Sequence, residues 1–114
     1  MCVNNFMDKK ENLLIISEII KEIPNSSFHT ISGEGKNGFD SHEFIRKFAK
    51  KFELEYVEFL YNYRNKNPFR VVHAQIALNL LKNKKRLNII DSGKTLSSDV
   101  FGIVVENEGW VKTV

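Results

Sequence analysis

The sequence predicts an α+β fold that is mainly helical and ends in a small antiparallel β-hairpin or sheet. Apolar residues recur at helical spacing along residues 8–23 and again through residues 40–86. Residues 87–114 instead contain short apolar runs separated by turn residues, which is typical of strands. The chain has 114 residues, of which 42% are hydrophobic, so we expect a single domain over residues 1–114.

The first helix is expected over residues 8–23. Asp8 and Glu11 have the spacing of a capping box, leucines and isoleucines follow at helical intervals, and Pro24 ends the pattern. These apolar residues cover more of the helix than one packing surface needs. A homodimer through this helix is therefore also predicted.

Residues 24–39 are expected to form an irregular Gly-rich loop with a short extended piece at residues 28–31. Within it, Gly33–Gly38 matches the dinucleotide-binding pattern G-x-G-x-x-G. The second parallel strand and the acidic residue that such a site requires are missing, because a strongly apolar helix follows instead. We therefore favour a surface loop, and no cofactor is expected.

The helix predicted over residues 41–51 begins at a second capping box, formed by Asp40 and Glu43. Its phenylalanines and its isoleucine fall on one side of a helical wheel, and its cations fall on the other. These cations are Arg46, Lys47, Lys50 and Lys51.

Two further helices are expected before residue 87. The first, over about residues 53–64, is apolar around most of its circumference, so it is expected at the centre of the core. Pro68 suits the first turn of the second helix, which runs to about residue 83. His73 lies beside apolar residues of that helix, which favours a core or half-buried histidine bonded to the backbone over a metal ligand.

The C-terminal part is expected to alternate between strands and turns. A short strand over 87–90 precedes a turn at 91–94, and a second strand covers 100–105. Another turn at 107–109 leads to a final strand over 110–114.

The order of these elements, three helices followed by strands, resembles the winged helix-turn-helix fold across roughly residues 40–114. The resemblance rests on element order and on the basic last helix. It implies that the helix over 68–83 enters the major groove of duplex DNA. It also implies that residues 87–114 form the β wing.

Positive charge is concentrated in one part of the chain. Residues 41–86 carry eleven Lys or Arg against four Glu, a local net charge of +7. Residues 1–40 and 87–114 each have a net charge of −2, so the whole chain is only +3. Charge gathered on a few elements is typical of nucleic-acid-binding proteins, because neutralised phosphates release counterions.

The predicted DNA contacts come from the last helix and the wing. Gln75 and Asn79 would lie one turn apart on the exposed face and suit contacts with adenine. The cations around and after them would hold phosphates, with Lys94 acting from the tip of the wing. The predicted DNA-binding residues are Arg70, Gln75, Asn79, Lys82, Lys84, Lys85, Arg86 and Lys94.

No motif predicts catalysis. Gly93–Thr95 resembles the end of a phosphate-binding loop but lacks the earlier glycine, so a turn is favoured. Asp40–His42 contains the residue types of a hydrolytic triad, but adjacent side chains do not converge as a triad requires. The three histidines share no metal-ligand spacing, so neither a metal nor an enzyme is expected.

The segment before the first helix has no signal-peptide core, and the single cysteine, Cys2, cannot form an internal disulfide. We therefore expect a cytoplasmic protein without a membrane span. The favoured function is a DNA-binding regulator or accessory factor. The alternative is a non-enzymatic interaction or inhibitor module whose basic face binds an acidic partner. A nuclease is a weaker third hypothesis, because no carboxylate cluster has a recognisable spacing.

Overall fold

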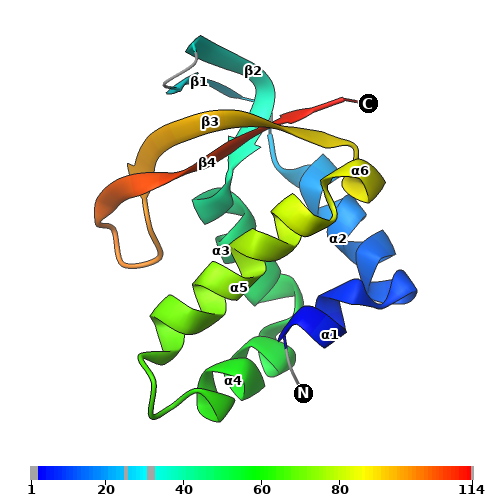
Figure 1. Cartoon of the computed structure of the whole chain (residues 1–114), viewed down its shortest axis with the longest axis vertical. Helices are drawn as coiled ribbons and strands as arrows, with labels where there is room; N and C mark the ends of the chain where they lie inside the picture. Colours follow the sequence, from blue (N-terminus) through cyan, green and yellow to red (C-terminus); the bar gives the residue numbers. More distant parts are fainter. Residues whose placement is uncertain (1–2, 25, 31–32, 114) are drawn as a thin grey trace.

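The computed structural model describes residues 3–24, 26–30 and 33–113. Helices form one layer, and an antiparallel sheet lies across one end of it (Figure 1), so the predicted α+β class is confirmed. The elements in chain order are α1 (Val3–Asp8), α2 (Lys10–Glu22), β1 (Ser26–Thr30), β2 (Gly33–Asp40), α3 (Ser41–Lys51), α4 (Glu53–Asn62), α5 (Pro68–Lys82), α6 (Lys84–Leu87), β3 (Ile89–Ser98) and β4 (Val104–Lys112).

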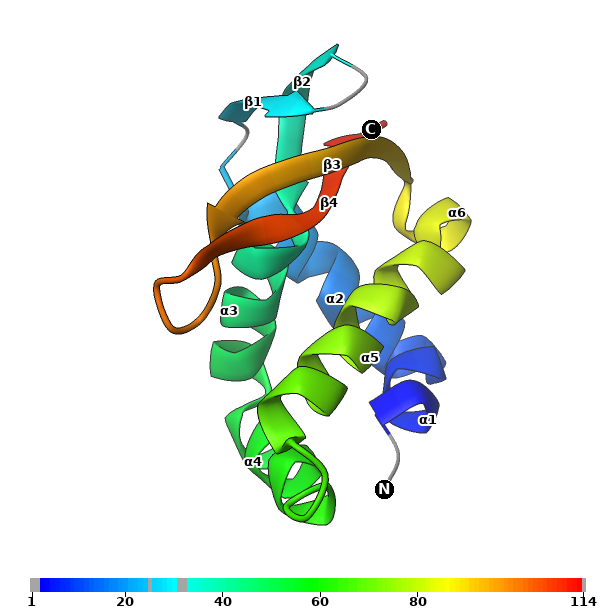
Figure 2. The ribbon, with the colours of Figure 1, turned by 60° about the vertical axis from the view of Figure 1, so that its left-hand side comes forward.

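The four described strands follow the order β1-β2-β4-β3, and each neighbouring pair is antiparallel. The pairing between β2 and β4 is short: Gly38 pairs with Val111, Phe39 with Trp110, and Asp40 with Gly109. The rest of the β3–β4 hairpin extends beyond the part that pairs with β2 and curves over the helices (Figure 2).

The N-terminal part contains two helices where one was predicted. Asp8 ends α1 and does not cap α2, since its carboxylate accepts hydrogen bonds from Lys82 (2.6 Å) and Asn83 (3.4 Å). Ile16, Ile19 and Ile20 of α2 are buried inside one copy of the chain. They therefore do not supply the second packing surface from which the homodimer was inferred, and the homodimer stays a prediction.

The segment predicted as a Gly-rich loop forms a β-hairpin instead. The backbone of Ser26–Thr30 pairs with that of Gly33–Asp40, and the register shifts once along the pair. The extended piece predicted at residues 28–31 overlaps β1, whereas β2 was not predicted, because its Gly-rich sequence has no alternating apolar pattern. Ile31, the last residue of the predicted extended piece, lies outside the described residues, as do Cys2 and Val114.

Helix α4 lies at the edge of the helical layer, so its predicted central position is wrong. Leu54 is 82% exposed, and Val57 and Tyr61 are also exposed, whereas Phe59 is buried. The helix occupies the end of the molecule farthest from the sheet (Figure 1), where it packs against α3 and α5 and where Phe59 meets Phe6 of α1.

The core lies between the helices and the sheet. Trp110 and Phe39 of the sheet are fully buried and belong to the same cluster as the phenylalanines of the helices. Phe6 of α1 meets Phe52 and Phe59 edge to face, at ring-centroid distances of 4.9 and 5.5 Å. Such aromatic pairs stabilise the packing beyond the area they bury.

The two predicted turns of the wing are wrong. Asp91–Gly93 forms a β-bulge inside β3, in which the Asp91 carboxylate accepts from the Gly93 amide at 2.9 Å. Residues 107–109 pair with β3 throughout. The chain reverses at residues 99–103, where the Asp99 carboxylate accepts from the amides of Phe101 (2.8 Å) and Ile103 (3.0 Å).

The capping box at the start of α3 is confirmed. The Asp40 carboxylate accepts from the Glu43 amide at 2.9 Å, and the Asp40 amide donates to the Glu43 carboxylate at 3.4 Å. The cap satisfies two backbone donors that would otherwise lack partners at the start of the helix.

Asp40→Ala should lower the free energy of unfolding by about 1 kcal/mol, because the helix loses its N-cap acceptor. Urea unfolding followed by the fluorescence of Trp110, the chain's one tryptophan, measures this loss. Lys51→Ala, at the exposed end of the same helix, is the control and should change stability by less than about 0.5 kcal/mol. Equal losses in the two variants would contradict the structural role of the cap.

Candidate functional site

The two predicted base-reading residues do not lie on an exposed face. Asn79 is only 1% exposed, and its amide nitrogen donates to the backbone oxygen of Gln75 at 3.1 Å. Gln75 is half-buried and donates to the Tyr63 hydroxyl at 3.0 Å. The polar side of α5 points inward because α1 and α4 cover it and the polar groups bond to one another. The expected exposure of these two residues is therefore wrong.

Two of the predicted phosphate-binding lysines form ion pairs within the chain. Lys82 pairs with Asp8 at 2.6 Å, and Lys94 pairs with Glu108. Lys94 lies in the middle of β3 rather than at the tip of the wing, so its predicted position is also wrong. The real tip, residues 99–103, carries no cation.

The remaining predicted cations are spread over two places. Lys84, Lys85 and Arg86 form most of α6, where Lys85 and Arg86 are exposed and Lys84 is half-buried. Arg70 is exposed near the start of α5. The predicted residues are therefore not brought together on one surface.

A compact group of exposed cations lies instead on α3. We call Arg46, Lys47, Lys50 and Lys51 the cationic surface; all four side chains are exposed. They form two consecutive pairs, Arg46–Lys47 and Lys50–Lys51, one helical turn apart, so their side chains are neighbours on one side of the helix. The helical wheel already separates these residues from the buried side, but they were not among the predicted DNA-binding residues. In both views α6 lies at the C-terminal end of α5, whereas α3 lies beside α5 (Figures 1 and 2).

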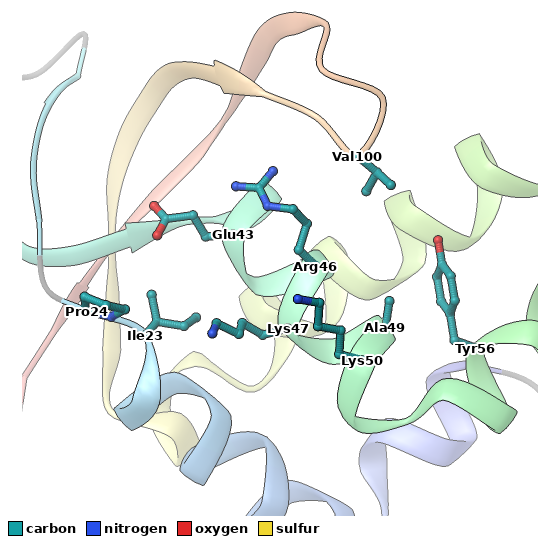
Figure 3. Close-up of a pocket in the computed structure, with 9 residues that line it drawn as sticks. All are labelled: Ile23, Pro24, Glu43, Arg46, Lys47, Ala49, Lys50, Tyr56 and Val100. Carbon is teal, nitrogen blue, oxygen red and sulfur yellow. The ribbon is translucent and has the colours of Figure 1, made fainter.

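A cavity of about 440 Å³ adjoins the cationic surface. Figure 3 shows Arg46, Lys47 and Lys50 projecting from α3 along it, with Tyr56 at one end and Pro24 at the other. The remaining lining residues are Ile23, Glu43, Ala49 and Val100. The cavity thus combines three cations with an apolar surface.

The charges around this cavity are partly fixed in position. Arg46 donates to the backbone oxygen of Ser98 at 2.8 Å, which holds its guanidinium beside the hairpin. Glu43 is the one carboxylate among the lining residues. Burial, reinforced by the nearby Asp40 carboxylate, raises the pKa of Glu43 above its usual value. An added negative charge is therefore opposed by Glu43 and favoured by the cations.

Tyr56 links the cavity to α5. Its hydroxyl is hydrogen-bonded to Nε2 of His73 at 2.5 Å, and the two rings are nearly parallel. His73 is half-buried as predicted, with a side-chain partner rather than a backbone one. Burial lowers the pKa of His73 and raises the pKa of Tyr56. Both groups are therefore neutral at neutral pH.

Ser41 and His42, the first two residues of α3, connect that helix to the β3–β4 hairpin. The Ser41 hydroxyl accepts from Nε1 of Trp110 at 3.0 Å and donates to the backbone oxygen of Glu108 at 3.2 Å. Nδ1 of His42 is hydrogen-bonded to the Ser97 hydroxyl at 2.8 Å. Each polar group of this junction serves to join β3 or β4 to α3.

Within the described part of the chain, no three histidine, cysteine, aspartate or glutamate side chains gather as a metal site would require. None of the described helices is long and apolar enough to cross a membrane. Comparisons of the chain with protein-family models, curated proteins and solved structures gave no match.

The buried His73 should make stability depend on pH. Because its pKa is below the ordinary value of 6.5, the unfolded chain binds the proton more readily than the folded chain. This contribution to stability is fully present above pH 6.5 and is lost as the pH falls through 6.5 towards the folded pKa. The loss is about 1.4 kcal/mol for each unit by which the pKa is lowered.

Urea unfolding at about pH 7.5 and about pH 5 measures this dependence. In His73→Gln the fall in stability between the two pH values should be smaller than in the parent. Lys51→Ala, which leaves His73 in place, is the control and should keep the parent's dependence. An unchanged dependence in His73→Gln would contradict the assignment.

Proposed function

We propose that the protein binds nucleic acid, with the cationic surface of α3 contacting the phosphates of duplex DNA. One observation carries the proposal: α3 has four exposed cations and one carboxylate, a net charge of +3 on eleven residues. Phosphates are the dense anionic ligand that such a surface fits, and their neutralisation releases counterions. A role as a regulator or accessory factor would follow from this binding.

The arrangement of like charges supports an anionic partner. Arg46 and Lys50, and likewise Lys47 and Lys51, are four residues apart, so each pair repels on the helix surface. Glu43 is the only acidic side chain on this helix, and it is half-buried. A bound phosphate would relieve these repulsions, which the single carboxylate of Glu43 offsets only in part.

The cavity favours α3 over α6 as the contact element. Lys84–Arg86 occupies a four-residue helix next to Asp8, whose negative charge acts on both Lys82 and Arg86. The cationic surface of α3, by contrast, adjoins the apolar surface of Ile23 and Val100. A phosphate with its attached sugar could therefore place charge on the cations and carbon atoms in the cavity.

This proposal keeps the DNA expected from the sequence but changes the contacting element. Gln75 and Asn79 take no part, because one is half-buried and the other fully buried. The proposal is therefore one of phosphate binding with little dependence on base sequence. Base edges carry the sequence information, and no side chain is assigned to them.

Replacing Lys47 and Lys50 by alanine should weaken binding to any duplex. Fluorescence anisotropy with a random duplex of about 30 base pairs, measured at several salt concentrations, gives the affinity and its salt slope. The slope should fall by roughly two, since each lost phosphate contact removes about one unit. Lys84→Ala combined with Lys85→Ala removes the same charge from α6 and serves as the matched control.

Two outcomes would contradict this proposal. Loss of binding in the α6 variant with normal binding in the α3 variant would move the interface to α6. No binding by the parent protein, even at low salt, would exclude the cationic surface as a nucleic-acid interface.

Glu43→Gln should strengthen DNA binding at neutral pH by roughly threefold, because one negative charge in the cavity beside the cationic surface is removed. The capping box tolerates glutamine at this position. Since the pKa of Glu43 is raised, the parent's carboxyl takes up a proton at a higher pH than an ordinary glutamate does, and the advantage should shrink as the pH falls. Glu11→Gln, on the exposed side of α2, is the control. A constant advantage across this pH range would show that the charge of Glu43 is not its cause.

A further inference from the structure

A long groove lies between α5 and the β3–β4 hairpin, and Val100 lines both this groove and the cavity beside the cationic surface. It consists of two adjoining cavities of about 760 and 530 Å³. The two cavities share the lining residues Ser41, Ala74, Ala77, Glu106 and Asn107, so they form one continuous depression. We call it the α5–hairpin groove.

Both walls of the groove expose large apolar side chains. On α5, Leu78 is 60% exposed, and Phe69 and Leu81 are also exposed. On the hairpin, Phe101 is 59% exposed and meets Phe69 edge to face at 4.9 Å, which closes one end. Val105 lies on the same wall. An apolar surface of this extent next to polar residues is typical of a protein-binding site.

We propose that the α5–hairpin groove binds an extended peptide segment of a partner protein, with apolar side chains flanked by lysine or arginine. This binding is a second activity, independent of the nucleic-acid binding proposed above. Two features of the groove define the ligand: the balance of its charges and its length.

The net charge of the groove is opposite in sign to that of α3. Its lining contains four carboxylates and two cations, a net charge of −2 within a chain of net charge +3. Lys94, one of the two cations, is paired with Glu108. The other carboxylates are Asp91, Asp99 and Glu106. A positively charged segment is therefore favoured over an acidic one.

The length of the groove fits a short extended peptide. Its α5 wall runs from Phe69 to Leu81, which corresponds to about 18 Å of helix at 1.5 Å per residue. An extended chain covers that distance in roughly five or six residues. Such a segment could bury apolar side chains between Phe101 and Leu78 while its basic ends lie near the carboxylates.

The test uses three synthetic peptides that share a core of leucine, isoleucine and phenylalanine and differ in their flanking residues: lysine, glutamate or serine. Titration of the full-length protein, followed by amide chemical shifts, locates the binding surface. The lysine-flanked peptide should bind at least tenfold more tightly than the glutamate-flanked one, with shifts at α5 and the hairpin.

Leu78→Glu should weaken binding of the lysine-flanked peptide by at least about tenfold, because an apolar contact is lost. Leu54→Glu makes the same change on α4, where Leu54 is still more exposed, and should leave the affinity unchanged. Glu106→Lys should reduce the preference for the lysine-flanked peptide. Both leucines are exposed, so these variants should fold, and unchanged DNA binding by Leu78→Glu provides a check on folding that is separate from the groove.

Three results would overturn the proposal. One is equal affinity for the lysine-flanked and glutamate-flanked peptides. Another is unchanged binding by Leu78→Glu. The third is a dimer of the parent protein in sedimentation that Leu78→Glu converts to a monomer, since the groove would then be occupied by a second copy of the chain.

Discussion

Three consecutive residues, Asp40–His42, hold the helices and the sheet in one arrangement. Asp40 ends β2, pairs with Gly109 of β4 and caps α3, so the strand leads directly into the helix. Ser41 and His42 then bond to the hairpin, through Trp110 Nε1 on one strand and the Ser97 hydroxyl on the other. These groups are buried, and each would carry an unmet desolvation cost if its partner moved. The position of the hairpin over α3 and α5 therefore depends on this junction.

Local signals in the sequence were sufficient to predict an element whose start and buried side are determined by its own residues. The cap and the two-sided pattern of α3 lie within eleven residues, and its predicted bounds of 41–51 are confirmed. The same kind of signal gave the wrong answer in the hairpin, because Asp91–Gly93 has the composition of a turn but forms a bulge in a continuing strand. Only the pairing with β4, more than a dozen residues away, distinguishes the two structures.

Long-range packing also decided which side of α5 is exposed. Its polar residues were expected to face solvent, but Asn79 lies inward, where α1 covers that side and Asp8 bonds to Lys82 and Asn83. In the segment that forms α1, Val3, Phe6 and Met7 have helical spacing, but six residues are too few for this pattern to predict a helix or the surface that it covers. The consequence is an α5 whose exposed side is apolar, with Leu78 in a groove.

The cations of α3 could be predicted from the sequence, whereas the cavity beside them could not, because Ile23 and Val100 come from distant parts of the chain. The same holds for the groove, whose two walls meet only after the hairpin folds over α5. For this reason the net charge of the whole chain did not indicate the charge of either surface. A chain of +3 separates into a helix of +3 and a groove of −2 that lie on different surfaces. Screening over about 8 Å at physiological salt makes each surface act on its own partner. The partner class therefore has to be inferred from each surface, and the two surfaces point to ligands of opposite charge.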